Sequence, residues 1–133
     1  MISRTVLVAP EPFGGGLDAA RAAAAIGRGL RAGDPQLAID LCPLDAAAPS
    51  DERLRAARAV VVGAARLDEA TLLGSATFEL ATRARQSGVP AYAVAGRNAL
   101  SLFDARVLDL QVVLEARDTR ALRRAGEQLA GLV

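Results

Sequence analysis

Short apolar runs alternate with amphipathic segments along the whole chain. Five mainly apolar runs are typical of buried strands, and they cover residues 5–9, 37–42, 60–62, 91–95 and 107–114. Between them, helical spacing and capping residues predict helices over 18–30, 51–57 and 75–86 and from Asp118 onward, with one or two helical turns over 68–73. The chain is therefore predicted to alternate strand and helix throughout.

Polar caps and apolar stripes support these helices. The side chains expected to accept hydrogen bonds from free N–H groups at helix starts belong to Asp18, Ser50 and Asp118. The stripes expected to face the core are Ala23, Ile26 and Leu30 in the first long helix and Leu122, Ala125, Leu129 and Leu132 in the last. Each of these helices thus has a predicted start, a predicted buried face, or both.

Five strand–helix units with short apolar strands predict one α/β domain over residues 1–133. Parallel strands buried on both faces imply a three-layer α/β/α sandwich, and five strands favour the flavodoxin-like order 2-1-3-4-5. Ligands in such sheets bind beyond the carboxyl ends of the strands, where the strand order reverses. The loops expected there are residues 11–17 and 64–74, after the first and third strands.

Missing residue types narrow the possible chemistry. The chain has no histidine and no lysine, so all sixteen of its basic residues are arginine. Histidine bases, histidine-ligated zinc, a P-loop lysine and Schiff-base chemistry are therefore excluded. A net charge of +1 and an aromatic content of 3% provide neither a basic surface for nucleic acid nor a platform for stacking bases.

The expected environment is cytoplasmic. No apolar run approaches the ~20 residues of a membrane span. The single cysteine, Cys42, excludes an internal disulfide and is expected to be a small buried residue. We therefore predict no membrane and no nucleic-acid partner, but a homo-oligomer or a complex with a partner chain.

Three successive glycines, Gly14, Gly15 and Gly16, lead into the first predicted helix. Exposed backbone N–H groups at a helix start can bind an anion, and the alternative is a turn that needs positive φ. Arg66 and Arg97 each follow a predicted strand, so both are expected at the ligand-binding edge. For Arg66 an ion pair with Asp68 or Glu69 is the alternative to a ligand, and for Arg97 a solvated side chain is favoured over a ligand role.

Asp68 and Glu11 are the two acids of interest near this edge. Asp68 is expected to cap the short helix, with Thr71 three residues further on. Glu11 could bind a metal, but a single carboxylate is too little for magnesium without help from a phosphate. Because residues 10–16 contain no hydroxyl, the hydroxyl-rich phosphate loop of a flavodoxin is excluded.

Two stretches resemble the two-domain bacterial glycerate kinases. That family opens with a pattern like Ala-Pro-Asp-Ser-Phe-Lys-Gly-Ser-Leu, and the residues that match it are Ala9, Pro10, Phe13, Gly15 and Leu17. It closes with Gly-Glu-Gly-Arg-Leu-Asp, then Gln-Thr and Gly-Lys, and the residues that match are Gly63, Arg66, Leu67, Asp68, Thr71 and Gly74. The resemblance, taken together with the positions of the glycines and of Arg97, gives a candidate ligand-binding set of Glu11, Phe13, Gly14, Gly15, Gly16, Arg66, Asp68, Thr71 and Arg97.

The chain lacks several charged residues of the family and its second domain. After the second strand the family continues with Pro-Leu-Ala-Asp-Gly-Gly-Glu-Gly-Thr and a long second domain. Here Pro43-Leu44-Asp45 is followed by three alanines, residues 46–48, and almost at once by the third strand. Gly14 and Ser75 stand where the family has lysines, and Ala64 stands where it has a glutamate. Phosphoryl transfer depends on such charges, so the chain is expected to lack complete kinase activity.

We therefore interpret the sequence as a shortened glycerate-kinase-like protein. It could bind a small anion, a nucleotide or a glycerate-like ligand, and no catalytic residue is assigned. ATP and magnesium would be cofactors only if kinase activity survives, as a minimal enzyme or as one half of a split one. A third alternative is a structural or regulatory subunit without a ligand.

Overall fold

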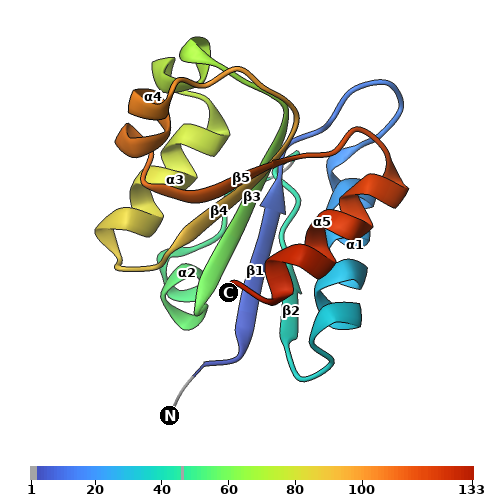
Figure 1. The fold of residues 1–133 in the computed structure, drawn as a ribbon. Helices are drawn as coiled ribbons and strands as arrows, with labels where there is room; N and C mark the ends of the chain where they lie inside the picture. Colours follow the sequence, from blue (N-terminus) through green and yellow to red (C-terminus); the bar gives the residue numbers. More distant parts are fainter. Residues whose placement is uncertain (1–2, 46) are drawn as a thin grey trace.

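The computed structural model describes residues 3–45 and 47–133, so Ala46 of the alanine-rich segment lies outside the described residues. Its strands form one parallel sheet in the order β2-β1-β3-β4-β5, which confirms the predicted fold (Figure 1). The strands are β1 Thr5–Pro10, β2 Ala38–Leu41, β3 Ala59–Leu67, β4 Ala91–Asn98 and β5 Leu110–Glu115. The helices are α1 Ala19–Gly33, α2 Asp51–Ala56, the 3-10 helix η1 Glu69–Leu73, α3 Ala76–Gln86, α4 Leu102–Val107 and α5 Thr119–Ala130.

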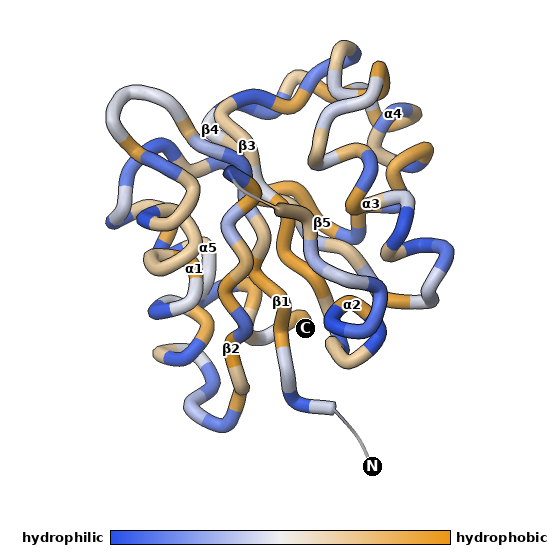
Figure 2. Tube along the Cα trace, turned by 180° about the vertical axis from the view of Figure 1, so that it is seen from behind, coloured by the Kyte–Doolittle hydropathy of each residue, from blue (hydrophilic) through white to orange (hydrophobic). Residues whose placement is uncertain are grey.

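Helices lie on both faces of the sheet, as the buried parallel strands require. α1 and α5 lie on one face, and α2, α3 and α4 lie on the other (Figure 1). Successive residues of β3 point to opposite faces, so Val61 packs toward α1 and α5 while Val60 and Val62 pack toward α2 and α3. The orange apolar positions in Figure 2 accordingly follow the central strands and the inner faces of the helices. These two apolar clusters form the core.

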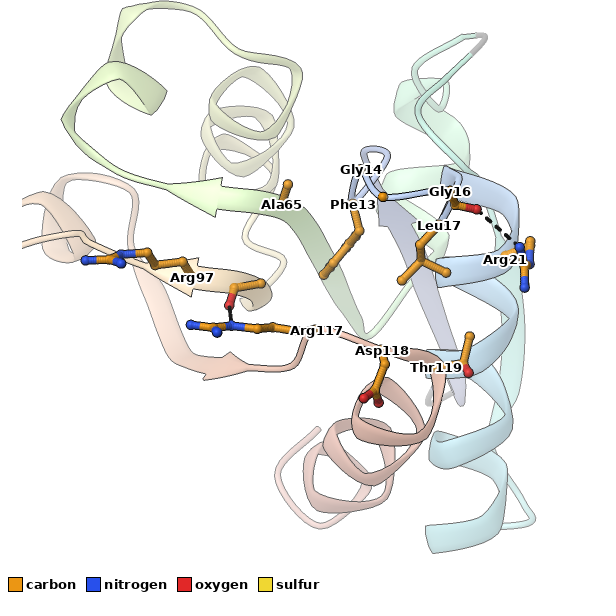
Figure 3. A pocket seen from close by; sticks show the side chains of 12 residues that line it. Phe13, Gly14, Gly16, Leu17, Arg21, Ala65, Arg97, Arg117, Asp118 and Thr119 are labelled. Carbon is orange, nitrogen blue, oxygen red and sulfur yellow. Dashed lines mark hydrogen bonds between the residues drawn. The ribbon is translucent and has the colours of Figure 1, made fainter.

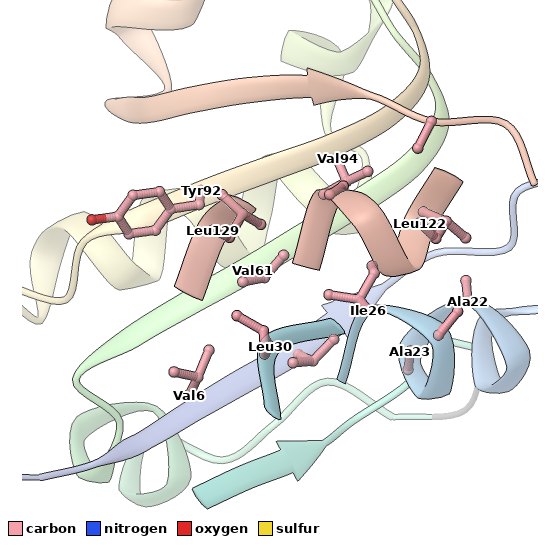
Figure 4. Packing of buried hydrophobic residues seen from close by; sticks show 14 of the residues in the cluster. Val6, Ala22, Ala23, Ile26, Leu30, Val61, Tyr92, Val94, Leu122 and Leu129 are labelled. Carbon is pink, nitrogen blue, oxygen red and sulfur yellow. The ribbon is translucent and has the colours of Figure 1, made fainter. Parts of the chain in front are cut away.

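The predicted helix caps are confirmed. The carboxylate of Asp18 accepts a hydrogen bond from the Arg21 N–H at 2.8 Å. Ser50 caps α2 and Asp118 caps α5 in the same way. The stripe of α1 and most of that of α5 are buried between these helices and the sheet (Figure 4). Leu132 is the exception: it lies beyond α5 and is 48% exposed.

The β4–β5 region differs from the prediction. The strand expected over 107–114 is β5, Leu110–Glu115, and Val107 instead ends the short helix α4. Ser101 caps α4, and none of the helix's residues is buried, so its pattern contained no apolar stripe to indicate it. A run of apolar residues spans the end of α4 and the start of β5, and for this reason the sequence pattern predicts a single strand there.

The third and fourth strands are longer than predicted. β3 continues past Val62 to Leu67, and β4 continues past Ala95 to Asn98. Their pairing holds Arg66 opposite Arg97 in the register of the two strands. Both arginines therefore lie inside strands and do not follow them, because backbone pairing continues where the apolar run stops.

Candidate functional site

Two neighbouring hollows lie beyond the carboxyl ends of the central strands. The larger, which we call the arginine pocket, has a volume of about 640 Å³, and its lining includes Gly14, Gly15, Gly16, Arg21, Arg97 and Arg117. The smaller, which we call the Glu11 pocket, has a volume of about 360 Å³, and its lining includes Glu11, Pro12, Arg66, Thr71 and Ser75. Ala65 at the end of β3 lines both, so the hollows are adjacent.

The glycine loop forms one wall of the arginine pocket. Gly14, Gly15 and Gly16 have φ values of 76°, 58° and 81°, so the predicted need for positive φ is confirmed. The Leu17 N–H donates to the Gly14 carbonyl at 3.0 Å, and the Phe13 N–H donates to the Leu17 carbonyl at 2.9 Å. These bonds close a tight loop that is exposed to solvent. Its role as an anion site stays a prediction.

Two arginines of this pocket were not singled out from the sequence. The Arg21 Nη1 donates to the Gly16 carbonyl at 3.2 Å, which holds the side chain against the glycine loop. The Arg117 Nε donates to the Gly96 carbonyl at 3.0 Å, which holds that side chain against the end of β4 (Figure 3). Both could have been found by their position, because Arg21 lies in the first turn after the glycine loop and Arg117 follows the last strand.

The arginine pocket carries an excess of positive charge. Arg21, Arg97 and Arg117 line it together with one acid, Asp118. The Asp118 carboxylate already accepts the Ala121 N–H at 2.8 Å as the cap of α5. Within residues 3–45 and 47–133, no carboxylate lies within ion-pair distance of these three arginines. Guanidinium groups with free donors can bind carboxylates or phosphates through parallel hydrogen bonds.

Glu11 is engaged inside the protein. Its Oε2 accepts a hydrogen bond from the Thr77 N–H at 3.1 Å and another from the Thr77 hydroxyl. Thr77 is fully buried in the first turn of α3, two residues after the cap Ser75. The carboxylate thus lies at the helix N-terminus, where a negative charge is stabilised. The predicted ligand-binding role of Glu11 stays a prediction.

Arg66, Asp68 and Thr71 also contact one another. The Arg66 Nε donates to Asp68 Oδ2 at 2.7 Å, and this hydrogen bond holds the pKa of the Asp68 carboxyl below its usual range. Asp68 Oδ1 accepts the Ala70 N–H at 3.0 Å, and the Asp68 N–H donates to the Thr71 hydroxyl at 3.0 Å. This is the capping box that the spacing of Asp68 and Thr71 indicated, and it confirms the cap.

The predicted ligand-binding residues are therefore divided between the two hollows, except for Asp68, which lines neither. Phe13, the three glycines and Arg97 line the arginine pocket, while Glu11, Arg66 and Thr71 line the Glu11 pocket. Across the part of the chain that the structure describes, no cluster of three acidic or cysteine side chains could hold a metal. Over the same residues, no helix is both long and apolar enough to cross a membrane.

Comparison with known proteins gives a family and a fold. The model of the glycerate kinase family matches residues 44–130. A flavodoxin from the domain Archaea is 13% identical with a TM-score of 0.56, over 96% of this chain and 97% of that one. The diflavin flavoprotein A3 from Nostoc sp. is 15% identical with a TM-score of 0.55, over 98% and 90%.

A third structure, the flavodiiron protein from Giardia intestinalis, is 12% identical with a TM-score of 0.57. It matches 97% of this chain, but the chain spans only 36% of its length. At these identities the three structures show a shared fold alone. No curated protein matches the chain significantly.

Proposed function

Because the chain belongs to the glycerate kinase family, we propose that it has an anion site and has lost complete kinase activity. The site is the arginine pocket. Its ligand is a small anion, a nucleotide or a glycerate-like acid. The protein acts by binding this ligand, and it does not transfer a phosphoryl group by itself.

The observation that carries the proposal is the set of unpaired arginines at the carboxyl edge of the sheet. Arg97 and Arg117 project from the β4 and β5 ends, and Arg21 lies beside the glycine loop. Three guanidinium groups against one capping carboxylate favour a negatively charged occupant. This edge is also where parallel α/β sheets bind ligands.

Two further observations support the loss of transfer chemistry. The chain has no lysine to stabilise charge on a transferred phosphoryl group. Glu11 and Asp68, the acids that directly follow β1 and β3, both accept backbone N–H groups at helix starts with their carboxylates. A deleted second domain would also remove the surface that closes over a substrate and excludes water.

Thermal unfolding of the purified chain tests the proposal. ATP with magnesium, ADP and glycerate should be added separately and together. A ligand that binds only the folded state stabilises it by ~2.7 kcal/mol at a hundredfold excess over Kd, so at least one of these ligands should raise Tm. Arg117→Gln should reduce the shift, and Arg28→Gln, on the exposed face of α1 outside both hollows, should leave it unchanged.

The same samples distinguish the alternatives. No shift in Tm at high millimolar ligand would contradict the binding site and favour a subunit without a ligand. Formation of phosphoglycerate would contradict the loss of activity. If phosphoglycerate formed only after addition of a separate chain that supplies the missing second domain, the protein would be better described as one half of a split kinase.

A further inference from the structure

The positive charges of the arginine pocket lie at its two ends. Figure 3 shows Arg21 at one end, and Arg97 and Arg117 at the other, with Phe13 and Leu17 between them. All five side chains line the same hollow. A ligand with a single anionic group could contact only one of these ends at a time.

Both ends are pre-oriented by the backbone. Arg21 donates one N–H to the Gly16 carbonyl, and Arg117 donates its Nε–H to the Gly96 carbonyl. Each guanidinium carries five N–H donors, so each retains several for a ligand. A side chain that is already held loses less conformational entropy when it binds, which favours a specific contact at each end.

The middle of the pocket is lined by apolar groups. Phe13 is only 9% exposed and Leu17 packs against the core cluster, so both present hydrocarbon to the hollow. Ala65 and Gly96 contribute almost no side chain. A Cβ at Gly96 would lie 2.6 Å from the Ala65 carbonyl oxygen, so this position stays free of a side chain.

Asp118 adds a repulsive element. Its carboxylate lines the pocket while it caps α5. A second carboxylate close to it would be unfavourable, since like charges repel in a partly desolvated hollow. The favourable positions for negative charge are therefore beside Arg21 and beside the Arg97–Arg117 pair.

From this layout we propose that the natural ligand is a dianion whose two anionic groups are joined by an apolar spacer. The inference rests on the proposed anion site and specifies its ligand class. A pocket of about 640 Å³ has room for such a molecule. One anionic group binds at Arg21 and the glycine loop, and the other binds between Arg97 and Arg117.

The test compares α,ω-dicarboxylates with monocarboxylates of equal carbon number, using isothermal titration calorimetry at constant ionic strength. Chains of about four to ten carbon atoms fit a pocket of this size. We expect the best diacid to bind at least ~10-fold more tightly than its monoacid, a difference of about 1.4 kcal/mol. Arg21→Gln, and separately the double change of Arg97→Gln with Arg117→Gln, should each reduce this preference to about the twofold expected from two equivalent groups.

Controls separate this inference from the proposed site. Arg28→Gln should keep the full diacid preference, and circular dichroism should show that every variant folds. If monoacids or inorganic phosphate bind and diacids bind no better, the two-ended ligand is wrong while the anion site stands. If neither acid series nor phosphate binds, both proposals are wrong. A diacid preference that survives both arginine changes would also overturn the inference.

Discussion

Individual charged residues at the carboxyl edge fall into two groups with different partners. Glu11 and Asp68 have partners within the protein, at the starts of α3 and η1. Arg97 and Arg117 have no acidic partner among the described residues and face a hollow. Acids that accept N–H groups at helix starts contribute to stability, whereas arginines without an acidic partner can bind a ligand. Residue type alone does not reveal this division.

Glu11 provides a test of this distinction. Glu11→Ala removes the acceptor of the Thr77 N–H and leaves the buried Thr77 hydroxyl with only the Gly63 carbonyl, 3.5 Å away. We expect the free energy of unfolding to fall by about 1–3 kcal/mol, the usual cost of leaving a buried polar group unsatisfied. Urea denaturation measures it, with exposed Glu52→Gln on α2 as the control. A stability equal to that of the unchanged protein would show that Glu11 is free for a ligand.

Local contacts could be predicted from the sequence and distant ones could not. The capping of Asp18, Ser50, Asp68 and Asp118 involves atoms within a few residues, so spacing was sufficient. The contact of Glu11 with Thr77 joins residues 66 positions apart. It depends on how β1 and α3 meet in the fold, and no sequence pattern contains that geometry.

Among the elements, α1 and α5 pack closely against each other. Gly29 of α1 lies against the backbone of α5 near Arg123, and Gly126 of α5 lies against the backbone of α1 near Ile26. A β-carbon at either glycine would overlap backbone atoms of the other helix. The backbones of the two helices can therefore approach each other this closely only because both positions lack a side chain.

Gly126→Ala tests this contact. Alanine favours an isolated helix over glycine by about 1 kcal/mol, but here the added methyl group meets backbone that cannot move away easily. We expect a net loss of stability of about 1–3 kcal/mol, as for other overpacked sites. Gly131→Ala, where the nearest atom would be 3.7 Å away, should be nearly neutral. Equal denaturation midpoints for the two variants would refute the close contact.

Element boundaries were predictable where burial gives a pattern. The buried halves of β3 and β4 were found from their apolar runs, but the exposed ends that carry Arg66 and Arg97 were not. The short helix α4 buries no residue, so hydrophobic spacing contained no information about it. Strand order followed from five parallel strands, because few topologies allow right-handed crossovers on both faces.

On the scale of the whole molecule, α4 stands out as a helix without a buried face. Leu102 and Phe103 are 84% and 72% exposed, an unusual state for large apolar side chains. The same short helix carries Asp104 and Arg106, one charge of each sign. Two copies related by a two-fold axis would bring the acid of one helix toward the base of the other while burying both apolar pairs.

We therefore expect two copies of the chain to associate through α4. Sedimentation velocity over a range of concentrations should show a monomer–dimer equilibrium, and Phe103→Ser should shift it toward monomer because it removes apolar area from the contact. Leu132→Ser, at a position that is 48% exposed outside α4, should leave the equilibrium unchanged. A sedimentation coefficient of the monomer at every concentration would exclude this association.

The pairing of α1 with α5 also has a consequence for the order of events during synthesis. Helix α1 emerges early from the ribosome. Helix α5 is made only after the residues between Gly33 and Thr119. At 5–20 residues per second this delay is on the order of ten seconds. During that time the glycine-bearing face of α1 has no native neighbour in α5. Contacts between segments so distant in sequence also slow folding, and the nascent chain must therefore stay unaggregated with this face uncovered.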